Sequence, residues 1–182
     1  MHLESLLPPG TLSPLVLSLV MAIWDVRTRR IPNFLTFGGA LAGIIFQTAL
    51  WGWTGLGQSL AGLALGLLLL FLPYVLGGMG AGDVKALAAL GAWLGPKGIF
   101  SVFCFMGLVG GLLGLGVLLW TGKLWQYLRQ GWLRLVNFLL LRGQKKILLE
   151  ALTPGEARTA GIPYGVAIAL GMVLYLRWGN LL

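Results

Sequence analysis

Long apolar stretches limit what this chain can fold into more than any other feature does. Hydrophobic residues make up 58% of its 182 residues, and charged residues only 10%. A soluble domain of this composition would expose large apolar surfaces to water. The composition therefore predicts a polytopic membrane protein.

The apolar stretches have the length of transmembrane helices, since about 20 residues cross a hydrocarbon core of roughly 30 Å. We predict an all-α fold with six transmembrane helices. The first starts between Leu6 and Leu12 and ends at Trp24, and the others cover residues 34–53, 56–76, 84–94, 98–120 and 162–178. The fourth, stopped by Gly95-Pro96, would be only about 17 Å long. Its start, with Asp83, is therefore expected below the membrane surface, where backbone must line a protein-walled or watery cavity.

The basic residues predict the orientation. Alternating six spans puts eleven of the thirteen Lys and Arg residues on one side, and only Lys97 and Arg177 on the other. By the positive-inside rule the rich side is cytoplasmic. Both termini are then outside, and Asp25 and Asp83 open toward the cytoplasm. The N-terminus lacks the cationic start of a secretory signal, so we expect the first apolar segment to be retained.

One long hydrophilic connection, residues 123–159, interrupts the apolar pattern. We interpret the chain as a single membrane-embedded domain, 1–182, with 123–159 as a basic cytoplasmic insert. Polar residues recur within the insert at spacings of three and four, namely Lys123, Gln126, Gln130, Arg134 and Asn137. This pattern favours an amphipathic helix lying on anionic lipid, although a surface-bound connector without a specific role fits it too. The net charge of +8 is explained by these membrane-flanking positions, so we expect no nucleic-acid partner.

Two of the five acidic residues, Asp25 and Asp83, stand at the ends of apolar stretches. A carboxylate at membrane depth is costly, about 2.5–3.5 kcal/mol at mid-bilayer on insertion scales, and so indicates a functional site. Two carboxylates held close together share a proton, so that one serves as acid and the other as base. This is the chemistry with which activated water hydrolyses a peptide bond.

Simpler interpretations exist for the same residues. Asp83 could cap a helix by accepting the N–H groups of Val84 to Ala86, and Asp25 could form a surface ion pair with Arg27 or Arg29. Lys85 could reach to the interface or act on the charge of the nearby acids. Glycines at positions 77, 78, 80 and 82 are expected to adopt backbone conformations closed to other residues and to admit substrate closely.

Other chemistries lack their residues. His2 is the only histidine and none of the serines has a general base nearby in sequence, which argues against a Ser-His site. Two aspartates without His, Cys or a third acid in reach make a poor metal site. The single cysteine, Cys104, excludes a disulfide framework within the chain. Phosphate-loop and dinucleotide patterns are missing, so we expect neither metal nor cofactor.

Three sequence elements together resemble the type IV prepilin peptidase family of GxGD aspartyl proteases. Asp25 is followed six residues later by Ile31-Pro32-Asn33, then comes Gly78-Met79-Gly80-Ala81-Gly82-Asp83-Val84-Lys85, and Ile162-Pro163-Tyr164-Gly165 enters the last apolar stretch. The resemblance implies that Asp25 and Asp83 are the catalytic pair. It also implies supporting roles for the rest of the motif residues, which are Gly78, Gly80, Gly82, Lys85, Ile31, Pro32, Asn33, Pro163, Tyr164 and Gly165.

The same resemblance implies a substrate and a location. The substrate would be the basic leader of a pilin or pseudopilin precursor, cut at the cytoplasmic face of a bacterial or archaeal inner membrane. Longer members also N-methylate the new terminus through a cytoplasmic region with paired Cys-x-x-Cys motifs. Neither that region nor the paired cysteines occur among these 182 residues. The chain is therefore similar to the short, peptidase-only form associated with tight-adherence (Flp-type) pili. It departs from many relatives at Val166, where they have proline.

A non-enzymatic membrane protein is the alternative. In a transporter or a pilus-assembly subunit, the two aspartates would serve as proton or ion relays. Transporters are commonly built from inverted repeats, and no such repeat is evident in this sequence. Loss of peptide cleavage on neutralising either aspartate would distinguish a protease from a relay.

Overall fold

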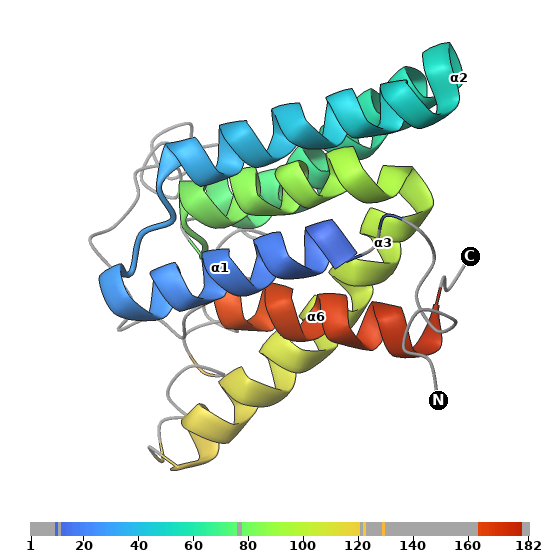
Figure 1. The fold of residues 1–182 in the computed structure, drawn as a ribbon. Helices are drawn as coiled ribbons and strands as arrows, with labels where there is room; N and C mark the ends of the chain where they lie inside the picture. The colour runs from blue at the N-terminus through green and yellow to red at the C-terminus, as the bar shows by residue number, and fades with distance from the viewer. Residues whose placement is uncertain are drawn as a thin grey trace, which may run out of the picture.

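The computed structural model describes Gly10, residues 12–75, 78–120, Gly122, Arg129 and residues 164–179. Every regular element in these ranges is a helix (Figure 1): α1 (Leu12–Thr28), α2 (Asn33–Val75), α3 (Ala81–Trp120) and α6 (Tyr164–Trp178). The prediction of an all-α fold is confirmed for this part of the chain.

Both long helices are interrupted by a glycine. Gly52 (φ 57°, ψ −137°) breaks α2, and Gly95 (φ 68°, ψ −178°) breaks α3 just before Pro96. Positive φ favours glycine, and proline lacks the N–H that would continue a helix. Each helix is thus two helical segments, and Figure 1 shows α2 running out along the bundle and back.

The two long helices are compatible with membrane insertion. By length and composition, Asn33–Val75 and Ala81–Gly116 can each cross a membrane, and large side chains on outer faces, such as Leu68 at 68% and Phe71 at 56%, are exposed. The break at Gly95 falls between the predicted spans 84–94 and 98–120, whereas the break at Gly52 lies just inside the end of the predicted span 34–53. The number of crossings, their orientation and the sides of the termini stay predictions.

The first segment of α3, residues 81–94, is the centre of the bundle. Its side chains are covered on all faces: Ala86, Leu87, Ala89, Leu90 and Ala92 are each 0% exposed. More contacts join α2 to α3 than join any other pair of described helices. The segment that carries Asp83 is therefore held mainly by protein, and chiefly by α2.

A seam of small residues lets the second segment of α2 approach this central segment closely. Ser59, Gly62 and Gly66 are buried at spacings of three and four. A Cβ at Gly62 would collide with the carbonyl oxygen of Gly91, and one at Gly66 would lie 2.8 Å from Ala88 Cα. Small residues at helix interfaces allow such backbone approach within membranes.

The second segment of α3, residues 96–120, packs against α6 in the opposite direction. A Cβ at Gly171 would lie 2.8 Å from Met106 N, whereas one at Gly98 would lie 3.2 Å from the Tyr175 hydroxyl. α6 in turn packs on α1. The C-terminal end of α1 and the N-terminal ends of α2, α3 and α6 thus meet at one end of the bundle, at the left of Figure 1.

Element boundaries differ from expectation in one place that matters. α3 begins at Ala81, three residues before the predicted start at Val84, so Gly82 and Asp83 belong to its first turn. The predicted interfacial helix, almost all of the insert 123–159, and Ile162 and Pro163 lie outside the described residues.

Candidate active site

Asp25 lies in the last turns of α1 and is only 8% exposed. Its Oδ2 accepts the backbone N–H of Gly165, the second residue of α6, at 3.0 Å. Among the described residues it forms no ion pair, so the surface pair with Arg27 or Arg29 considered above is wrong. Burial takes the carboxylate away from these surface cations, and a backbone amide at a helix N-terminus supplies the stabilising positive end instead.

The end of α1 fixes the position of Asp25. The Arg29 N–H donates to the Asp25 carbonyl at 2.7 Å, and Arg29 takes φ 52°, a left-handed conformation. Such a residue ends many helices, although glycine usually fills the position. The Thr28 hydroxyl lies within hydrogen-bond distance of the Trp24 and Arg30 carbonyls. Asp25 therefore sits one turn before a well-defined helix end.

Asp83 is the third residue of α3 and is also 8% exposed. Its Oδ2 accepts the Gly80 N–H at 3.2 Å, while the Gly80 carbonyl accepts the Asp83 N–H at 3.1 Å. This reciprocal pair has the form of a capping box, with Gly80 as the cap. The expectation that Asp83 itself caps the helix is wrong, because the helix starts earlier than its position.

The two acids lie at the same end of the bundle, where α1 ends and α3 begins. The Ile31 side chain, in the connection that follows α1, lies against the first turn of α3: a Cβ at Gly82 would be 3.4 Å from Ile31 Cβ. Asp25 and Asp83 thus come from different helices, and the connection that follows α1 contacts the first turn of α3. Each carboxylate has one backbone N–H partner and lies beside the positive end of a helix.

The glycines of the motif serve close packing and not unusual backbone angles. Gly78, Gly80 and Gly82 all lack a positive φ, so the expected conformational role is wrong for these three. Space is limited instead: a Cβ at Gly80 would lie 3.2 Å from Asp83 Oδ2, and one at Gly78 would lie 3.5 Å from the Pro73 carbonyl. Gly80 therefore leaves room for the Asp83 carboxylate.

Ile31-Pro32-Asn33 marks a helix start, as predicted. The Pro32 carbonyl accepts the N–H groups of Leu35 at 3.1 Å and Thr36 at 3.4 Å, and Asn33 is the first residue of α2. Lys85 Nζ donates to Asn33 Oδ1 at 3.1 Å and lies 5.4 Å from the centre of the Phe37 ring. Lys85 therefore ties the start of α3 to the start of α2, and in the described part of the chain it pairs with no carboxylate.

In the last motif element, Ile162-Pro163-Tyr164-Gly165, the glycine is the residue that contacts Asp25. Tyr164 begins α6, and a Cβ at Gly165 would lie 2.8 Å from Asp25 Cβ and 2.9 Å from Asp25 Oδ2. Pro163 lies outside the described residues. The motif predicted that these residues matter, but nothing in the residues themselves predicted a contact across so much sequence.

The fold and this site define a helical membrane-type bundle whose buried central helix presents one of two buried aspartates at its end. A model of the type IV leader peptidase family matches residues 12–115, so the chain belongs to that family. The match includes α1, α2 and most of α3, with both aspartates.

Curated relatives agree with this assignment. A prepilin leader peptidase/N-methyltransferase of Aeromonas hydrophila is 37% identical over 120 residues, which are 60% of this chain and 41% of that protein. Proteins of the same name in Xanthomonas campestris pv. campestris and Burkholderia pseudomallei are 31% and 34% identical, over 57% and 58% of this chain and 24% and 36% of theirs. The chain thus spans less than half the length of these relatives. No solved structure gives a significant match.

Proposed function

We propose that this chain is a membrane aspartyl endopeptidase that removes the basic leader of type IV pilin-like precursors, with Asp25 and Asp83 as the catalytic pair. The observation that carries the proposal is the burial of two carboxylates, without a cationic partner among the described residues, at the end of the bundle where α1 ends and α3 begins. A structural role would leave such charges paired, since an unpaired buried charge is strongly destabilising. The relatives' names supply the class of substrate.

The mechanism uses one carboxylate as base and the other as acid. The base takes a proton from a water molecule as the water oxygen bonds to the scissile carbonyl carbon, and the acid gives its proton to the carbonyl oxygen. The resulting diol then collapses: one of its hydroxyls returns a proton to the carboxylate that acted as acid, the C–N bond breaks, and the leaving nitrogen receives the proton that the other carboxyl took from water. Gly165 and Gly80 hold the two carboxylates through backbone N–H groups, which requires no rearrangement during the reaction.

Finer features of the proposal follow from the sequence. Cleavage takes place at the cytoplasmic face, because the basic residues predict that side for both acids. The precursor is of the Flp or tight-adherence type, and this stretch carries the peptidase step alone, because a single Cys104 cannot supply the paired cysteines that the resemblance connects with methyl transfer. Anionic lipid is the second partner, through the insert 123–159.

The test is cleavage of a candidate precursor from the same genome by purified protein in liposomes, scored as leader removal by mass spectrometry. Asp25→Asn and Asp83→Asn should each abolish cleavage, and the double variant should be no worse than either, since residues that act as a unit are not additive. Glu150→Gln is the matched control for removal of an acid. Near-normal cleavage by either Asp variant would overturn the assignment of the pair.

A further inference from the structure

The break in α3 leaves two backbone carbonyls without their usual partners. In an uninterrupted helix, the carbonyls of Ala92 and Trp93 would accept the N–H groups of residues 96 and 97. Pro96 has no N–H to give, and Gly95 turns the chain out of helical geometry. Buried carbonyls at a helix end need other donors.

Two side chains of α2 supply those donors. The Ser59 hydroxyl donates to the Ala92 carbonyl at 2.7 Å, and Gln47 Nε2 donates to the Trp93 carbonyl at 2.6 Å. Ser59 is 0% exposed. Gln47 and Ser59 lie on opposite sides of the Gly52 break, so both segments of α2 hold the same end of the central segment. Trp93 adds a third link by donating its indole N–H to the Gly39 carbonyl at 2.8 Å.

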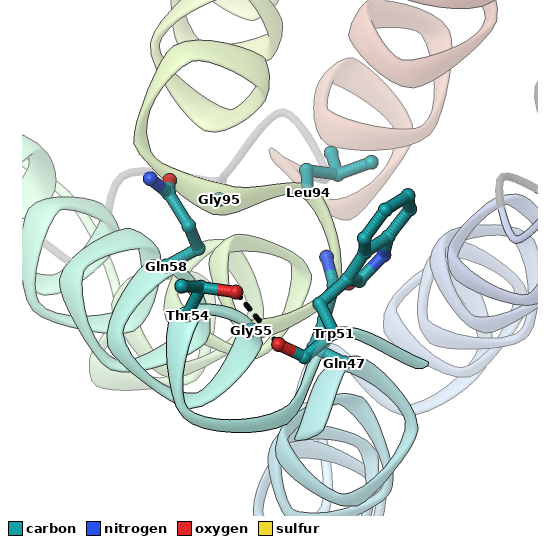
Figure 2. Close-up of a pocket in the computed structure, with 7 residues that line it drawn as sticks. All are labelled: Gln47, Trp51, Thr54, Gly55, Gln58, Leu94 and Gly95. Atoms are coloured by element: carbon teal, nitrogen blue, oxygen red, sulfur yellow. Dashed lines mark hydrogen bonds between the residues drawn. The ribbon is translucent and has the colours of Figure 1, made fainter. Parts of the chain in front are cut away.

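A pocket of about 310 Å³, lined by polar and apolar side chains, borders this junction. Figure 2 shows Gln47, Thr54 and Gln58 from α2 around Leu94 and Gly95 from α3. Thr54 donates only to the Trp51 carbonyl of its own helix, at 2.6 Å, and Gln58 makes no hydrogen bond to another described residue. The pocket is thus lined by two polar side chains, Thr54 and Gln58, that donate no hydrogen bond to α3, and by one, Gln47, that does.

The far end of the same segment carries Asp83. From Asp83 to Trp93 the segment rises about 15 Å, at 1.5 Å per residue. A buried helix moves as a rod, so a shift along its axis at one end appears at the other. The glycine seam keeps this rod close to α2 but presents smooth backbone surfaces, which resist sliding along the axis less than directional hydrogen bonds do.

We propose that Gln47 and Ser59 are positioning residues for Asp83: by capping the Ala92 and Trp93 carbonyls, they set the position of the central segment along its axis and hence the geometry of the acid pair at its other end. This inference rests on the proposed function. A misplacement of about 1 Å at a reacting group can reduce a rate by about 100-fold.

The experiment measures position and rate separately, on the full chain in lipid nanodiscs. Spin labels at Val26→Cys and Ala81→Cys, in a Cys104→Ser background, report the distance between the ends of α1 and α3; both positions are exposed. The variants are Ser59→Ala, Gln47→Met and both together. The matched controls are Thr54→Val and Gln58→Met, which change the same pocket without removing a hydrogen bond to α3.

We expect the double variant to shift the label distance by about 1 Å or to broaden its distribution, and to lower kcat by about 10-fold to 100-fold with KM within about twofold. The controls should change neither. If the double variant does not fold, Ser59→Ala alone is expected to change the label distance and kcat in the same direction but by less.

Either of two results would overturn the inference. One is an unchanged label distance, even if the melting temperature falls, because the hydrogen bonds would then only stabilise the fold. The other is a changed distance with unchanged kcat. If the unmodified protein cleaves no precursor, the proposed function fails, whereas the label distances still decide whether the two residues position the segment.

Discussion

Gly165 donates its backbone N–H to the Asp25 carboxylate across 140 residues of sequence, at 3.0 Å. The contact joins the first turn of α6 to the end of α1. It leaves no room for a side chain, because a Cβ at Gly165 would come within 2.9 Å of the carboxylate oxygen. The position of Asp25 is therefore set by a helix remote in the chain.

Gly165→Ala should reduce leader cleavage far more than it reduces stability. The added methyl group would displace Asp25, and misplacement of a reacting group lowers kcat by about 10-fold to 100-fold. Gly107→Ala is the matched control, because nothing lies within 4 Å of its Cβ. Parallel measurements of kcat and of unfolding temperature check this expectation. A loss of activity that merely follows a loss of folding would contradict it.

Gly80→Ala and Gly82→Ala should differ in their effect on cleavage. A Cβ at position 80 meets the Asp83 carboxylate at 3.2 Å, whereas one at position 82 meets Ile31 at 3.4 Å, close to ordinary contact. We therefore expect Gly80→Ala to lower kcat by about tenfold or more, and Gly82→Ala by much less. Steady-state kinetics of the two variants side by side decide the matter, and the reverse order would contradict this structure of the site.

Gly62→Ala should destabilise the protein by about 1–3 kcal/mol, the typical cost of overpacking. Its Cβ would collide with the Gly91 carbonyl in the seam between α2 and α3. Gly57→Ala, in the same helix with nothing within 4 Å, should instead stabilise by about 0.5–1 kcal/mol, because alanine is the better helix former. Unfolding in mixed micelles with increasing SDS gives both values. Equal effects would mean that the seam can open without cost.

Asn33→Ala and Lys85→Met should show a small coupling. Their side chains share one hydrogen bond, with Lys85 also over Phe37, and partly exposed charged groups contribute below about 1 kcal/mol. A double-mutant cycle on unfolding free energy measures the coupling. Because Lys85 pairs with no carboxylate in the described part of the chain, Lys85→Met should leave the pH optimum of cleavage unchanged. A displaced optimum would show that the amine acts on the acids directly.

The insert 123–159 gives a prediction of another kind. Replacing Arg129, Arg134 and Arg142 together by Gln should loosen it from anionic lipid, at about 1 kcal/mol for each cation near the surface. Because a basic leader would be repelled by the insert, we expect it to place the apolar part of the precursor. The triple variant should then raise KM and leave kcat nearly unchanged. Release from anionic vesicles without any change in KM would reduce the insert to a tether.

The sequence predicted those features that arise from local chemistry. Apolar runs predicted the helices, Gly95-Pro96 predicted the end of the short segment, and Ile31-Pro32-Asn33 predicted a helix start, since each depends on neighbouring residues. The sequence could not predict that the segment 81–94 is packed by protein on all sides, because a protein-buried helix and a lipid-facing helix are both apolar. The start of α3 was placed too late, since glycines at 80 and 82 weaken any helix signal.

Contacts between distant residues were harder to predict. The hydrogen bond from Gly165 to Asp25 and those from Gln47 and Ser59 to α3 depend on which helices become neighbours. In the sequence, Gln47 stands beside Thr48 and Ser59 beside Gln58, as short polar interruptions of apolar runs. Their hydrogen bonds to the Trp93 and Ala92 carbonyls become evident only from the geometry of the break at Gly95. The roles of the aspartates stay predictions until the variants are measured.

The remote contact between α1 and α6 also has a consequence for protein synthesis. A ribosome adds about 5–20 residues per second, so Gly165 is made roughly 4 to 16 seconds after Asp83. During that interval both acids exist, but the backbone amide that holds Asp25 does not. We expect nascent chains to be unable to cut precursors, so that proteolysis begins only once the helix that starts at Tyr164 has joined the bundle.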